Sequence, residues 1–171
     1  GDIKTRLPFT IGGMGSTAIA KNNWEGLAIG AAITGIPLAI GENVCGMDSK
    51  AEIVGGKVVH SPELELRVKL YKDWQRDGYG LVIVQTNIED TMLGVDEYAI
   101  SQLGVEAIEL KWGQGAKDIG GEVKIEDLNK ARLLKERGYI LLPDPDSPAV
   151  AEAFKQGKFK EFERHSRVGM V

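Results

Sequence analysis

Short runs of apolar residues recur along the chain, and most of them end in a glycine or a polar side chain. Continuous apolar runs of this length are typical of strands covered on both faces, as in a parallel sheet. The pattern predicts five strands, at residues 8–11, 37–40, 81–84, 107–110 and 139–142.

Between these runs the apolar positions take a helical spacing with clear start and stop signals. Ser61-Pro62 and Ser147-Pro148 each place an N-cap before proline, and these helices are expected to close before Gly78 and Gly157. Three more helices are predicted at residues 24–33, 96–103 and 126–137, each followed closely by a glycine. The alternation predicts an α/β fold with parallel strands and right-handed crossovers, and it leaves both an open sheet and a barrel possible.

Two segments depart from this regularity. Residues 47–60 suggest a surface hairpin, with Gly55-Gly56-Lys57 as its turn between residues 51–54 and 58–59. Residues 154–171 offer no further strand, and the charged run 155–167 is expected to be a solvated helix face. An eight-stranded barrel typically needs about 250 residues, so five strands in a single domain spanning 1–171 predict an incomplete barrel.

Composition narrows the class of partner. The 171 residues are 43% hydrophobic and 27% charged, an ordinary balance for a domain with a core, and the net charge of -4 argues against nonspecific nucleic-acid binding. No apolar run approaches the roughly 20 residues needed to cross a membrane, and no signal peptide is evident, so a cytoplasmic location is expected. Cys45 is the only cysteine, which excludes an internal disulfide and a cysteine-based metal or iron–sulfur site. Its thiol is expected to be buried and inert.

The residues with chemical use lie just after the predicted strands, where parallel sheets and barrels place their sites. Gly12, Gly13 and Met14 belong to a glycine cluster whose backbone can approach a ligand closely, or which simply forms a tight turn. Glu42 follows the second strand, where it can act as a general acid or orient a substrate. The alternative for Glu42 is a solvated or ion-paired carboxylate.

The run from Ile108 to Gly121 is the most informative stretch. It delivers Lys111, Gln114 and Lys117 from an apolar strand onto a glycine-rich loop. An ammonium that emerges from a buried strand needs an anion, either a ligand or a carboxylate such as Glu109 or Glu122. His60 and His165 have no second ligand residue at metal spacing and are expected at the surface.

Taken together, these segments resemble the FMN-binding synthase domain of glutamate synthase, in its short archaeal-type form. The strand and loop after residue 108 match its E-I-K-x-x-Q-G-A-K-P-G-x-G-G motif at Lys111, Gln114 and Lys117, with Asp118-Ile119 in place of Pro-Gly. Gly12-Gly13-Met14 resembles its G-A-M-S-x-G segment, and Gly41-Glu42 resembles its T-G-E-G-G loop, although Asn43-Val44-Cys45 replaces the glycines. Gln85 resembles a flavin-facing glutamine.

The resemblance implies a TIM barrel that uses reduced FMN to convert 2-iminoglutarate, formed from 2-oxoglutarate and ammonia, into L-glutamate. It implies that FMN is contacted by Gly12, Gly13, Met14, Gln85 and Lys111. Glu42, Gln114 and Lys117 would then be the catalytic residues that face the 2-oxo acid. The cysteines of the family's iron–sulfur cluster and the later barrel strands have no counterpart in these 171 residues.

Two alternatives remain. The chain can be a noncatalytic half-barrel that needs its missing C-terminal half or a second copy of itself, because sheet edges favour pairing. It can also be another flavin-dependent barrel, such as a 2-hydroxy-acid oxidase, but that chemistry requires a catalytic histidine after a strand. Neither His60 nor His165 is placed in that way.

Overall fold

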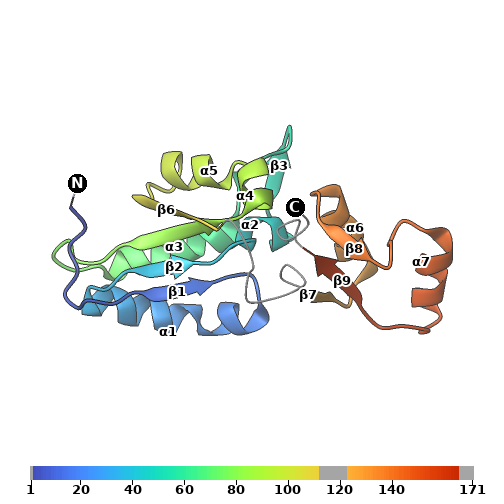
Figure 1. Ribbon diagram of the computed structural model, residues 1–171, viewed down its shortest axis with the longest axis horizontal. Helices are drawn as coiled ribbons and strands as arrows, with labels where there is room; N and C mark the ends of the chain where they lie inside the picture. Colours follow the sequence, from blue (N-terminus) through green and yellow to red (C-terminus); the bar gives the residue numbers. More distant parts are fainter. Residues whose placement is uncertain (1, 112–122, 166–171) are drawn as a thin grey trace. The chain divides into compact units, whose positions relative to one another are not determined.

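The computed structural model describes residues 2–111 and 123–165, which fall into two compact units, 1–111 and 112–171 (Figure 1). The expectation that residues 1–171 form a single barrel domain stays a prediction. The elements of the first unit are, in chain order, β1 (Ile11–Met14), α1 (Ala18–Thr34), β2 (Leu38–Ile40), α2 (Val44–Met47), β3 (Glu52–Val54), β4 (Lys57–His60), α3 (Pro62–Trp74), β5 (Val82–Thr86), α4 (Ile88–Met92), α5 (Val95–Ser101) and β6 (Ala107–Leu110).

The first unit is built on a four-stranded parallel sheet with the order β1-β2-β5-β6. This confirms the predicted α/β fold with parallel strands. Because the strands follow one another in chain order with no reversal, right-handed crossovers bring every connecting helix to the same face. Barrels built from (β/α) units have this order, and doubly wound sheets do not. The described strands form an open sheet and do not close a barrel.

The core lies on one face of this sheet. Leu38 and Val82 are paired in register, as are Ile40 and Val84, and all four side chains are buried in one cluster with residues of α1, α3 and α5. Side chains alternate along a strand, so the residues between them point to the opposite face. On β5 that face carries Ile83 and Gln85, which puts a polar side chain there near the end of the strand.

The predicted helix signals are confirmed. The Ser61 side chain accepts a hydrogen bond from the Leu64 amide at the start of α3, and Pro62 occupies the first helical position. Helix α1 ends at Gly35, whose φ of 69° is left-handed. The hairpin predicted around Gly55-Gly56 is present as β3 and β4.

Two strands of the first unit differ in position from the prediction. Strand β1 covers Ile11–Met14 and not residues 8–11, and the register with β2 shifts between Ile11 and Met14. The first two glycines of the cluster are therefore strand residues and not a loop. Strand β5 continues through Gln85 and Thr86, because both pair with β6.

The second unit contains an antiparallel sheet with the order β7-β9-β8. Its elements are β7 (Val123–Ile125), α6 (Leu128–Glu136), β8 (Ile140–Leu142), α7 (Pro148–Lys155) and β9 (Phe162–His165). Residues 139–142 were predicted to form a fifth parallel strand, and the predicted direction is wrong. It forms β8, which pairs antiparallel with β9.

Strand β9 corrects the expectation that residues 154–171 hold no strand and that residues 155–167 form a helix face. Burial alternates along this charged strand with a period of two, so that Phe162 and Arg164 are buried. The Arg164 guanidinium lies over the Tyr139 ring, 4.9 Å from its centroid, so a cation occupies a core position. His165 was expected at the surface, but its side chain is only 14% exposed.

Candidate functional site

The carboxyl ends of the four parallel strands bring together residues from four distant segments of the chain. These are the Met14–Gly15 segment after β1, the Gly41–Asn43 loop after β2, the end of β5 with the start of α4, and Lys111 after β6. Parallel strands place all their carboxyl ends at one edge of the sheet, which is why residues far apart in sequence meet there.

Lys111 and Glu42 form an ion pair at this edge. Lys111 Nζ donates to Glu42 Oε1 at 3.0 Å, and the Lys111 backbone amide donates to the Thr86 carbonyl at 2.8 Å. Both side chains are largely buried, with 27% and 17% exposed. The anion that Lys111 needs is therefore supplied within the described residues by Glu42. Glu109, one of the two expected carboxylates, is bound elsewhere.

Glu109 instead pairs with Gln85 on the neighbouring strand. Gln85 Nε2 donates to Glu109 Oε1 at 2.9 Å, and the two residues are in register between β5 and β6. The Gln85 side chain also reaches across the sheet to Gly13, where an added Cβ would lie 2.9 Å from Gln85 Oε1. Only glycine leaves room for the amide there. At Gly12 an added Cβ would have no heavy atom within 4 Å.

The β1 and β2 ends meet through backbone atoms. The Gly41 amide donates to the Met14 carbonyl at 2.9 Å. A Cβ added to Gly41 would lie 2.5 Å from the Gly15 amide nitrogen, and one added to Gly15 would lie 2.9 Å from the Glu42 carbonyl oxygen. Any side chain at either glycine would push these two segments apart, so glycine here sets the position of Glu42.

A buried carboxyl group joins the ends of β2 and β5. Asp90 Oδ2 accepts hydrogen bonds from the Asn43 amide at 2.9 Å and from the Asn87 amide at 3.3 Å, while Asp90 Oδ1 has no partner among the described residues. Burial raises the pKa of Asp90 to about 7, and the charges of Glu42 and Glu89 add to this rise. The group therefore holds its proton up to near-neutral pH.

Comparison with known families matches residues 2–145 to the conserved region in glutamate synthase. The chain belongs to this glutamate synthase family. No curated protein and no solved structure gives a significant match. The matched residues include all four strands of the parallel sheet and the residues at their carboxyl ends. The resemblance is thus confirmed at the level of the family, and the archaeal-type form stays a prediction.

One departure from the glutamate synthase pattern has a conformational explanation. Where the T-G-E-G-G loop has glycine after its glutamate, this chain has Asn43. Asn43 has a left-handed backbone with a φ of 67°. Asparagine tolerates this conformation better than most residues. The Asn87 side chain also donates to Asn43 Oδ1 at 3.0 Å, so Asn43 is held in this conformation by the start of α4.

The structure brings some of the predicted site residues together, and others lie outside the residues that it describes. The structure brings Glu42 next to Lys111, and it brings Gln85 next to Gly13, all at the same edge of the sheet. Met14 lies beside Gly41, as described above. Gln114 and Lys117 lie outside the described residues, so their proposed roles stay predictions.

The sequence did not single out two buried charged residues at this edge, Asp90 and Arg67. Arg67 Nη1 donates to the Met14 and Gly15 carbonyls at 3.0 and 2.8 Å. A signal for Arg67 existed, because it lies three residues after Leu64 and four before Tyr71, on the apolar stripe of α3. Asp90 lies three residues after Asn87 and forms a capping box with it at the start of α4.

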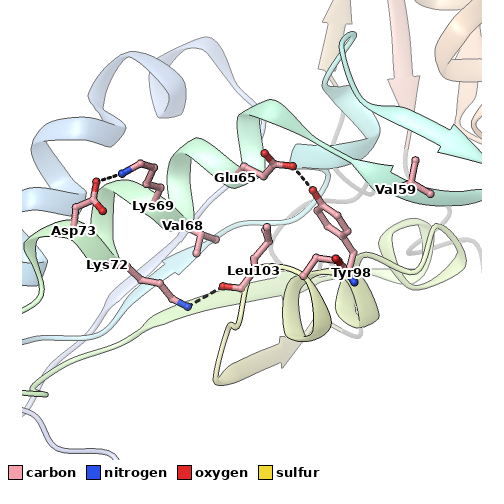
Figure 2. A pocket seen from close by; sticks show the side chains of 9 residues that line it. Val59, Glu65, Val68, Lys69, Lys72, Asp73, Tyr98 and Leu103 are labelled. Atoms are coloured by element: carbon pink, nitrogen blue, oxygen red, sulfur yellow. Dashed lines mark hydrogen bonds and ion pairs between the residues drawn. The ribbon is translucent and has the colours of Figure 1, made fainter.

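Two hollows of the first unit lie away from these residues. A groove of about 530 Å³ is lined mostly by residues of α3 and α5, and Figure 2 shows that its charged side chains are bound to neighbouring groups of the protein. Tyr98 donates to Glu65, Lys69 pairs with Asp73, and Lys72 Nζ donates to the Leu103 carbonyl at 2.8 Å. A second hollow is lined by residues 2–4, 72, 75, 78, 80, 81 and 106. Neither hollow contains a predicted site residue.

The remaining observations concern metal ligands, Cys45, His60 and membrane-spanning helices. Among residues 2–111 and 123–165, no group of three His, Cys, Asp or Glu side chains is arranged to hold a metal ion. Cys45 is buried, as expected. His60 Nδ1 lies 2.7 Å from Glu65 Oε1, and its side chain is 44% exposed. No helix in the described part of the chain is long and apolar enough to cross a membrane.

Proposed function

We propose that this chain provides part of the active site of an FMN-dependent glutamate synthase, which reduces 2-iminoglutarate, formed from 2-oxoglutarate and ammonia, to L-glutamate. The observation that carries the proposal is the ion pair between Lys111 and Glu42 at the carboxyl ends of a parallel sheet. Membership of the glutamate synthase family supports it.

The strand ends suit the ring system of FMN. Lys111 provides a fixed cation, Gln85 provides an amide, and Gly12 leaves open space above the strand. A fixed cation stabilises the negative charge that a flavin carries at its N1–C2=O edge when it is reduced. When bound, the reduced flavin supplies the hydride for the imine. A site for the flavin phosphate is not assigned among the described residues.

The remaining roles belong to side chains of this chain. Glu42 keeps Lys111 oriented by the ion pair, and we assign its carboxylate to orienting the imino nitrogen of the substrate. Gln114 and Lys117 match the family motif that faces the 2-oxo acid, and an amide and an ammonium suit its carboxylate groups. Because Lys111 and Glu42 are already paired, a ligand meets a preformed arrangement and loses little free energy in ordering it.

The test is a titration of the monodisperse 171-residue chain with FMN, followed by flavin fluorescence and visible absorption. Saturable binding, and reoxidation of the reduced flavin that requires both 2-oxoglutarate and ammonia, are the expected results. Folded protein that does not bind FMN would require the same titration with the full-length gene product. Failure there as well would refute the flavin assignment.

A second candidate function is a noncatalytic half-barrel that pairs with further strands or with another copy of itself. The observation that favours it is the open sheet, in which β1 and β6 are the end strands. Light scattering of the purified chain separates the two candidates. A stable dimer that does not bind flavin supports the structural role, and a monomer that binds flavin supports the enzyme.

A further inference from the structure

Arg67 is a buried cation on α3, and its guanidinium contacts a carboxylate, an aromatic ring and two backbone carbonyls. Its side chain is 2% exposed, and Nε donates to Glu63 Oε1 at 3.0 Å. The guanidinium lies 5.1 Å from the centroid of the Trp24 ring, and the Trp24 indole donates to the Arg67 carbonyl at 3.2 Å. Lys21 adds a second cation to Glu63 at 2.8 Å. Glu63 and the Trp24 ring thus hold the guanidinium directly, and Lys21 holds Glu63.

This arrangement is costly if its only purpose is packing. Removing a guanidinium from water costs several kcal/mol, and apolar residues of similar volume often replace buried ion pairs without loss of stability. Burial lowers the pKa of Arg67, which shows the same desolvation cost. An apolar side chain, however, cannot bind two backbone carbonyls.

The carbonyls that Arg67 binds belong to consecutive residues, Met14 and Gly15. In a trans peptide the C=O and the following N–H point in opposite directions, so Arg67 fixes the orientation of two successive peptide planes. The same Met14 carbonyl accepts the Gly41 amide, and Gly15 packs directly against the backbone of Glu42. The contacts therefore run from Arg67 through the Met14–Gly15 segment to Glu42.

We propose that Arg67 is a positioning residue: it holds the Met14–Gly15 segment against Gly41 and so sets Glu42 opposite Lys111. Arg67 itself does not touch the ligand. The claim that Arg67 positions Glu42 rests on the contacts alone. The claim that this positioning serves flavin binding rests on the proposed function.

The first test uses the ligand-free chain and needs no flavin. In Arg67→Lys, which keeps the charge but loses the forked geometry, the amide NMR signals of Gly15, Gly41 and Glu42 are expected to shift. The signals of Gly55 and Gly56 in the hairpin are expected to stay in place. A folded Arg67→Lys variant with unchanged signals at all three strand-end residues would overturn the inference.

The second test measures FMN affinity. Arg67→Lys and Glu63→Gln are expected to weaken FMN binding roughly tenfold and to change the absorption maximum of the bound flavin. Arg76→Lys is the control, because Arg76 also lies over a tryptophan ring and donates to backbone carbonyls, but it is exposed beyond the end of α3.

A double-mutant cycle separates positioning from general stability. If Arg67 acts through Glu42, Arg67→Lys changes FMN affinity much less in a Glu42→Gln background than in the wild type. Equal effects in both backgrounds would overturn the inference and leave the proposed function intact. Wild-type protein, including the full-length gene product, that binds no FMN would refute the proposed function, and the amide signals would then decide the inference alone.

Discussion

Lys111 Nζ reaches Glu42 Oε1 across the end of an intervening strand. The two residues follow β6 and β2, and β5 lies between these strands in the sheet. Adjacent strands are about 4.8 Å apart, so the lysine side chain spans roughly two strand spacings. The Lys111 amide meanwhile binds β5 at Thr86. Lys111 thus connects the ends of β2, β5 and β6, and its ammonium group lies near the middle of the carboxyl edge of the sheet.

Replacing Lys111 by alanine should weaken FMN binding at least roughly tenfold, since the cation proposed to face the reduced flavin is lost. Lys57→Ala is the control, because Lys57 lies on the β3–β4 hairpin and its Nζ donates to the Met92 carbonyl. Fluorescence titration measures both affinities. If the two variants lose affinity equally, Lys111 has no special role.

Gly13→Ala should displace Gln85, whereas Gly12→Ala should leave the contacts within the protein in place. The new methyl group at residue 13 would lie 2.9 Å from Gln85 Oε1, so Gln85 must move and its hydrogen bond to Glu109 is disturbed. The methyl group at residue 12 meets nothing within 4 Å of the protein. We expect weaker FMN binding in Gly13→Ala, with the free energy of unfolding nearly unchanged because a side chain can yield. Equal flavin affinities in the Gly13→Ala variant and the wild type would contradict this.

Gly41→Ala should destabilise the fold by on the order of 3 kcal/mol, because its methyl group would meet the Gly15 backbone at 2.5 Å and backbone cannot yield cheaply. Gly30→Ala should have the opposite sign. Gly30 is exposed inside α1 with open space around it, and alanine is favoured over glycine there by about 0.5–1 kcal/mol. Urea denaturation measures both free energies of unfolding. A neutral Gly41→Ala would show that the two loops are not in tight contact.

Asp90→Asn should stabilise the protein more at pH 8 than at pH 5. The pKa of Asp90 rises from its ordinary value of 3.8 to about 7 in the folded chain. Between these values the folded state binds the extra proton, so the contribution of this group to stability falls as pH rises, by at most about 1.4 kcal/mol per pH unit. Asparagine keeps the acceptor for the Asn43 and Asn87 amides but carries no charge.

The measurement is the denaturation midpoint of both proteins across this pH range, with Asp77→Asn as an exposed control. A difference between Asp90→Asn and the wild type that stays constant from pH 5 to pH 8 would show that Asp90 is ionised throughout.

The sequence predicted the parts of the fold that depend on local chemistry. The strand at 107–110 and the hairpin turn at Gly55-Gly56 follow from apolar runs and glycines, and the starts of α3 and α7 follow from Ser-Pro. These signals act within a few residues. The direction of residues 139–142 was predicted wrongly, because apolar content reports burial and does not report which strand lies alongside.

The sequence allowed several residues of the candidate site to be named, but it did not allow us to predict which of these side chains contact each other. Lys111 was expected to bind a ligand, Glu109 or Glu122, and the described structure pairs it with Glu42. Strand register decides this choice, since it places Glu109 beside Gln85 on β5. Lys111 follows the end of β6, and its side chain extends past the end of β5 to Glu42. Arg67 was missed although it lies on the apolar stripe of α3, and its hydrogen bonds to the Met14 and Gly15 carbonyls correspond to no sequence motif.

The ion pair at the edge of the sheet also has a consequence for the order of events during folding. Glu42 and Lys111 are 69 positions apart, and the chain between them contains the two strands of the hairpin, β5, β6 and four helices. Contacts of such long range carry a larger loop-closure cost than local contacts, which favours their late formation. A growing chain cannot assemble this pair until Lys111 has left the ribosome, when all four strands of the described parallel sheet have been synthesised.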